Sequence, residues 1–130
     1  MTEQPGAMQN KKRNPVVHFE VLGRDASALR SFYSGAFGWS PGPAEGPMEY
    51  SMVHFNDAGG IDGGIGKAPQ GPGHATFYVG VDDVQAALDR VERLGGRPIQ
   101  PPMTIPDGVT FALFADPEGH LVGLVQEPER

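Results

Sequence analysis

The sequence predicts an α+β fold in which two tandem βαβββ modules form a cupped mixed sheet with the helices outside. Two observations predict it. A strand, an amphipathic helix and further short strands follow one another twice along the chain, and the two occurrences align residue by residue. One module alone cannot bury both faces of its own sheet, so the two modules are expected to pack as one unit.

The first module begins with a strand. Residues 16–21 alternate, with Val17, Phe19 and Val21 on one face and His18 and Glu20 on the other. A helix follows, capped at its start by Asp25 and ending near Gly38. Its apolar residues recur at spacings of three and four: Leu29, Phe32, Tyr33, Ala36 and Phe37. Residues 50–55 and the glycine-rich residues 59–66 are interpreted as further strands.

The second module repeats this order. Residues 74–81 alternate as a strand, Asp82 or Asp83 caps a second helix, and Gly95-Gly96 stops it. Residues 99–105, interrupted by Pro101-Pro102, and then 111–114 and 121–125 are predicted strands. The turn Asp116-Pro117-Glu118-Gly119 joins the last two as a hairpin.

The same reading gives the domain boundaries. Residues 1–14 are polar and aperiodic, which predicts a flexible tail, and residues 15–127 form one domain. Module one spans about 15–66, a Pro- and Gly-rich linker spans 67–73, and module two spans about 74–127.

The internal repeat is the most informative feature of the chain. When His18 is set on Thr76, Phe19 meets Phe77, and the capping residue Asp25 meets Asp83. When the second module is shifted by one further residue against the first, the ends of the two modules also align. The pairs at those ends are Phe55 with Phe114, Gly60 with Gly119 and Gly64 with Gly123.

Composition excludes several classes of function. The formal net charge is −6, which argues against nonspecific nucleic-acid binding and against an anionic membrane as partner. The chain has no cysteine, which excludes thiolate metal sites and a cysteine nucleophile. No apolar run is long enough to span a bilayer and the N-terminus lacks an apolar signal core, so a cytoplasmic protein is expected.

Several motifs resemble the vicinal oxygen chelate superfamily, also called the glyoxalase/bleomycin-resistance/dioxygenase superfamily. The resemblance covers residues 15–127 and is closest to small glyoxalase-like proteins. It is carried by three stretches: His18-Phe19-Glu20-Val21 with Phe37-Gly38-Trp39, Val81-Asp82-Asp83-Val84 with Leu94-Gly95-Gly96, and Asp116-Pro117-Glu118-Gly119-His120. It implies the cupped-sheet fold, a small-molecule ligand in the cup, and a homodimer.

The resemblance also implies where a metal would bind. Metal-dependent members of the family take ligands from the first and last strands of each module, and these positions fall on His18, Gly64, Thr76 and Gly123. Only His18 is a usual ligand, so no metal and no other cofactor is expected. The alternative is a displaced divalent site for Ni, Zn, Fe or Mn built from His18, Glu20 and His74.

Two functions from different classes therefore stay open. The first is a binder that holds a small organic ligand in the cup without a metal. The second is an enzyme of the lyase, isomerase or dioxygenase type, with His18 and Glu20 as catalytic residues. In either case the expected ligand-binding residues are His18, Glu20, His54, His74, Thr76 and Tyr78. A His18–Glu20 contact that only balances charge is the purely structural alternative.

Overall fold

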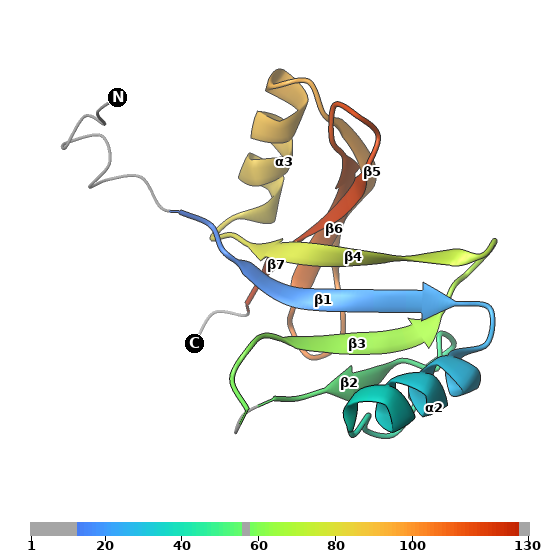
Figure 1. Ribbon diagram of the computed structural model, residues 1–130. Helices are drawn as coiled ribbons and strands as arrows, with labels where there is room; N and C mark the ends of the chain where they lie inside the picture. Colours follow the sequence, from blue (N-terminus) through green and yellow to red (C-terminus); the bar gives the residue numbers. More distant parts are fainter. Residues whose placement is uncertain (1–12, 56–57, 128–130) are drawn as a thin grey trace, which may run out of the picture.

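The computed structural model describes residues 13–55 and 58–127, and within them the chain forms one seven-stranded sheet and two helices (Figure 1). Module one contains β1 (Val16–Gly23), α2 (Ala26–Phe37), β2 (Ser51–Val53) and β3 (Asp62–Lys67). Module two contains β4 (Gly73–Gly80), α3 (Val84–Arg93), β5 (Arg97–Thr104), β6 (Thr110–Ala115) and β7 (Leu121–Gln126). The strand order is β2-β3-β1-β4-β7-β6-β5, so the predicted α+β fold is confirmed.

The two modules meet at the centre of the sheet. β1 and β4 pair antiparallel, and Phe19 lies directly opposite Phe77. These two residues are equivalent in the internal repeat, so a local two-fold axis passes between them. The same register places His18 opposite Tyr78 and Glu20 opposite Thr76. The repeat therefore brings the candidate residues of both modules together.

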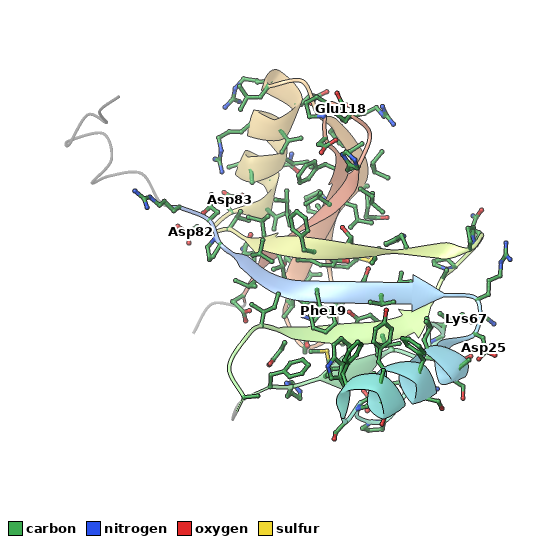
Figure 2. The ribbon with its side chains drawn as sticks, in the orientation of Figure 1. Phe19, Asp25, Lys67, Asp82, Asp83 and Glu118 are labelled. Atoms are coloured by element: carbon green, nitrogen blue, oxygen red, sulfur yellow. The ribbon has the colours of Figure 1, made fainter. Side chains whose placement is uncertain are left out.

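Each helix covers its own part of the sheet. Asp25 and Asp83, which are labelled in Figure 2, cap the two helices. Each side chain accepts a hydrogen bond from the backbone N–H three residues on, at 2.9 and 3.0 Å. α2 packs against β1 and β3, and α3 packs against β5, β6 and β7. The core beneath α3 is Val84, Ala87, Leu88, Ala112 and Leu124. Because side chains alternate along a strand, the residues between these strand positions face the opposite, concave side of the sheet.

Module one has fewer strands than the repeat predicts. About three strands are expected after its helix, and the described residues form two, β2 and β3. The segment between α2 and β2 forms isolated backbone contacts and no continuous ladder within the described residues. They include the bridge Glu45–Tyr50, a bond from Gly42 N–H to the Met52 carbonyl at 2.9 Å and a bond from Lys67 N–H to the Met48 carbonyl at 2.7 Å. Prolines 41, 43 and 47 lack the N–H groups that a continuous ladder requires.

Several strand limits also differ from the predicted ones. The strand predicted at 50–55 is limited to Ser51–Val53, because the N–H of Phe55 bonds the Asp62 side chain instead of a neighbouring strand. β3 begins at Asp62, since Gly59 and Gly60 have φ values of 81° and 90°. β5 runs through Pro101-Pro102 with register shifts on either side of Gln100.

Two further predictions concern the N-terminal tail and membrane-spanning segments. Residues 1–12 of the predicted tail lie outside the described residues, and residues 13–14 form neither helix nor strand. Neither α2 nor α3 is long and apolar enough to cross a bilayer.

Candidate functional site

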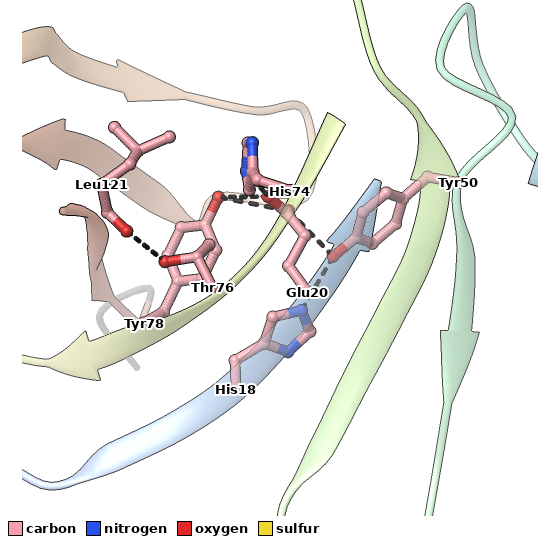
Figure 3. Close-up of polar contacts among 7 residues, drawn as sticks. All are labelled: His18, Glu20, Tyr50, His74, Thr76, Tyr78 and Leu121. Carbon is pink, nitrogen blue, oxygen red and sulfur yellow. Dashed lines mark hydrogen bonds and ion pairs between the residues drawn. The ribbon is translucent and has the colours of Figure 1, made fainter. Parts of the chain in front are cut away.

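Glu20 lies at the centre of a polar cluster on the concave face of the sheet (Figure 3). Its side chain is almost fully buried, with 7% of the residue exposed. The Tyr50 hydroxyl donates to Oε1 at 3.1 Å, and the Tyr78 hydroxyl lies 3.2 and 3.3 Å from the two carboxylate oxygens. A buried carboxylate requires such donors, so the two phenols are what allow Glu20 to lie there.

The electrostatics of the cluster follow from this burial. Desolvation raises the pKa of Glu20, and the hydrogen bonds from Tyr50 and Tyr78 oppose that rise. Burial and the adjacent Glu20 charge raise the pKa of both tyrosines, so they stay neutral donors. The arrangement favours a single buried negative charge that is held by two neutral hydroxyl groups.

His18 joins the cluster through Tyr50. Its Nε2 lies 2.9 Å from the Tyr50 hydroxyl oxygen, and its ring meets the Tyr78 ring edge-on at 5.7 Å between centroids. Burial lowers the pKa of His18, and the nearby Asp62 carboxylate partly offsets that effect. His18 is therefore biased toward its neutral form.

His74 approaches Glu20 from the start of β4. Its Nε2 lies 3.8 Å from Oε2 of Glu20, which is within ion-pair range and too long for a hydrogen bond. The same nitrogen is buried and has no hydrogen-bond partner among residues 13–55 and 58–127. The cluster thus contains one polar atom that its own side chains leave unsatisfied.

Two glycines make room for the tyrosine rings. A Cβ added at Gly64 would overlap the Cζ and Oη of Tyr50, and one added at Gly123 would overlap the ring of Tyr78. Gly64 is the register neighbour of Glu20 on β3, and Gly123 is the neighbour of Tyr78 on β7. These are two of the four positions where the family resemblance places metal ligands. Aromatic rings now fill the space that those side chains would need.

The residues present do not fit a divalent metal. His18 Nε2 is engaged by Tyr50, both oxygens of Glu20 are engaged by phenol groups, and the Nε2 of His74 is directed at Glu20. Across residues 13–55 and 58–127, no group of three or more His, Cys, Asp or Glu side chains could hold a metal ion. The displaced site of His18, Glu20 and His74 therefore has no ligand geometry in this structure.

The other predicted residues lie at the margins of the cluster. Thr76 shares the face with Tyr78, but its hydroxyl donates to the backbone carbonyl of Leu121. His54 is exposed, and its Nδ1 lies 2.9 Å from the carboxylate of Asp62 and not near Glu20. Tyr50 belongs to the cluster but was not predicted from the sequence. The face of the sheet to which its side chain points depends on how β2 aligns with the glycine-rich β3.

Comparison with known proteins gives several relatives. The chain matches the Glyoxalase/Bleomycin resistance protein/Dioxygenase superfamily over residues 16–124. It is 36% identical over 111 residues to the putative glyoxylase CFP32 of Mycobacterium bovis, covering 78% of this chain and 41% of that protein. A glyoxylase-like domain-containing protein of Didymella fabae is 31% identical over 116 residues, covering 84% of this chain and 91% of that protein. The chain thus spans about two fifths of the mycobacterial relative.

Solved structures share the fold. A hypothetical protein from Bacillus halodurans superposes with a TM-score of 0.71 at 16% identity, covering 92% of this chain and 98% of that one. Methylmalonyl-CoA epimerase from Streptomyces coelicolor superposes with a TM-score of 0.68 at 18% identity, covering 89% of this chain and 96% of the epimerase. From the profile match over most of its length, the chain belongs to the Glyoxalase/Bleomycin resistance protein/Dioxygenase superfamily.

Proposed function

We propose that this protein binds a small organic ligand on the concave face of its sheet without a divalent metal ion. The single observation that carries the proposal is the placement of the Tyr50 and Tyr78 rings over Gly64 and Gly123. The two rings occupy the space that side chains at these two ligand positions would need, and they direct their hydroxyl groups at Glu20. Such a site offers aromatic surface together with a few fixed polar groups, which is the usual character of small-molecule sites.

The Nε2 atom of His74 is buried 3.8 Å from Glu20 and has no hydrogen-bond partner within the described part of the chain. A buried imidazole nitrogen without a partner is costly, and a ligand that supplies the missing hydrogen bond would remove that cost. Phe111 packs edge-on against Tyr78 at 6.5 Å between ring centroids and extends the aromatic surface toward β6. The ligand class that fits is therefore a partly aromatic or apolar molecule with polar substituents.

A fragment screen by NMR tests this proposal. Binding compounds are expected to shift the amide resonances of Glu20, His74 and Tyr78, which surround the concave face. A surface cleft away from the cluster, between α3 and β5 and lined by Gln85 and Ile99 among others, serves as the internal control. A set of fragments that bind only at that cleft, or none that bind at the concave face, would contradict the proposal.

A second candidate function is proton transfer of the isomerase type. The observation that favours it is the buried Glu20 carboxylate, whose pKa is raised by burial in the way that suits a general base. The likeness to methylmalonyl-CoA epimerase shows the fold alone, so this candidate depends on Glu20 itself. Incubation of a bound carbonyl compound in D2O tests it, since exchange of the C–H next to the carbonyl should occur with the wild type and be lost in Glu20→Gln.

We also propose that the protein is a homodimer. Several large apolar side chains are exposed on the single chain, and burial of some of them against a second copy would remove apolar surface from water. They include Phe32, Phe37, Phe77 and Leu94. The cytoplasmic location stays a prediction from the sequence.

A further inference from the structure

The Tyr50 hydroxyl sits between two partners and has only one hydrogen to give. Its oxygen is 3.1 Å from Oε1 of Glu20 and 2.9 Å from Nε2 of His18. If Tyr50 donates to Glu20, its oxygen must accept, and Nε2 of His18 must carry the hydrogen. If Tyr50 donates to His18, then Glu20 must be protonated in order to donate to Tyr50.

The second tyrosine decides between these arrangements. The Tyr78 hydroxyl lies nearly equidistant from both oxygens of Glu20, at 3.2 and 3.3 Å, and it has no other hydrogen-bond acceptor among the residues that the structure describes. Tyr78 therefore donates its hydrogen to the Glu20 carboxylate, which is the acceptor for both tyrosines. A carboxylate that accepts from two phenols is best matched by its ionised form, because hydrogen bonds to a charged acceptor are stronger.

We infer that Tyr50 holds neutral His18 in the Nε2–H tautomer and leaves Nδ1 as a free hydrogen-bond acceptor for a hydroxyl or N–H group of the ligand. Within the described residues, Nδ1 of His18 has no hydrogen-bond partner. Tyr50 is thus a positioning residue that acts through His18. The tautomer is a property of the free protein, whereas the statement about the ligand rests on the proposed function.

The arrangement also links His18 to the buried charge. A proton accepted at Nδ1 would leave the Nε2–H bond to Tyr50 intact, and Tyr50 would still donate to Glu20. The carboxylate would then stabilise the resulting imidazolium across one intervening hydroxyl. The ligands that fit best are those with a weakly acidic hydroxyl or N–H group.

The imidazole nitrogens of 15N-histidine-labelled protein report the tautomer directly. At a pH where His18 is neutral, the wild type should show hydrogen on Nε2 and none on Nδ1. Tyr50→Phe keeps the ring and removes the acceptor, so the preference for Nε2–H should be lost. Tyr78→Phe is the matched control, because it also removes a phenol from Glu20 but leaves the bond to His18, and it should retain the wild-type tautomer.

Three results would overturn the assignment: hydrogen on Nδ1 in the neutral wild type, a Tyr50→Phe spectrum that matches the wild type, or an equal change in Tyr78→Phe. Phenol and its methyl ether, anisole, then probe the ligand statement. Phenol should move the Nδ1 resonance and anisole should not; equal effects or none would refute the donor requirement. Because the tautomer is read without ligand, its failure is distinguishable from failure of fragments to bind the concave face.

Discussion

The ring of Tyr50 lies over the α-carbon of Gly64, so closely that even a methyl group at position 64 would overlap it. Gly64 is in turn the register neighbour of Glu20 on the adjacent parallel strand. The absence of a side chain at position 64 therefore allows the phenol of Tyr50 to reach the carboxylate of Glu20. This is the physical link between a lost ligand position and the polar cluster that replaces it.

Gly64→Ala should destabilise the protein by roughly 1–3 kcal/mol, because the added methyl group must displace the Tyr50 ring from a packed position. Urea unfolding measures the change in the free energy of unfolding. Gly35→Ala is the control, since Gly35 lies within α2 with open space around it and should gain about 0.5–1 kcal/mol. An equal response of the two variants would show that the ring does not occupy this position.

Glu20→Gln should change how stability depends on pH. The pKa of Glu20 is raised in the folded state, chiefly by burial, so the folded protein holds this proton more tightly than the unfolded chain does. Wild-type stability relative to Glu20→Gln should therefore fall as the pH rises from the ordinary carboxyl range through the raised pKa. Urea midpoints of both proteins across this pH range measure the difference, and a constant difference would contradict a buried, titrating Glu20.

His18 should show the opposite kind of dependence. Its pKa is lowered in the folded state, chiefly by burial, so the unfolded chain binds this proton more readily. Stability relative to His18→Asn should fall as the pH drops from the ordinary histidine value toward the lowered one. Direct NMR titration of the imidazole provides the second measurement. Protonation of His18 at or above the ordinary value would rule out a desolvated ring.

The two helix caps, which are equivalent in the internal repeat, should contribute similar amounts to the free energy of unfolding. Asp25→Ala and Asp83→Ala should each cost about 1 kcal/mol, because each removes an acceptor for an unpaired N–H at the first turn of a helix. Asp83→Asn keeps a capping oxygen and should cost much less. Thermal unfolding followed by circular dichroism compares the variants, and a loss in Asp83→Asn equal to that in Asp83→Ala would show that capping is not the cause.

The proposed homodimer has a direct measurement. Sedimentation velocity at micromolar concentration should give a mass twice that of the 13.8 kDa chain. A monomer at these concentrations would contradict the dimer and leave the concave-face site on one chain unaffected, because every residue of the cluster comes from the same chain.

The sequence predicted the architecture because the fold repeats itself. The alternation of β1 and β4 has a period of two, which places His18 and Glu20 on one face of β1 and His74, Thr76 and Tyr78 on one face of β4. Alignment of the two modules makes β1 and β4 neighbours. Three of these side chains, His18, His74 and Tyr78, do lie in the cluster around Glu20.

Other parts of the site depend on the register between neighbouring strands, which could not be predicted from the sequence. Tyr50 is found just before a three-residue strand that pairs with a glycine-rich one, so no hydrophobic alternation reveals its facing. His54 was predicted to bind ligand, yet the exposed end of β2 places it beside Asp62. The prolines that prevent a third strand in module one act through missing N–H groups, an effect that the repeat alignment does not reveal.

The metal content of tag-free purified protein tests the central claim most directly. The rings of Tyr50 and Tyr78 over Gly64 and Gly123 predict substoichiometric nickel, zinc, iron and manganese. They also predict no heat of binding that depends on His18 when Ni²⁺ or Zn²⁺ is titrated into the protein. One equivalent of any of these metals, present in the wild type and absent from His18→Ala, would contradict the metal-free site.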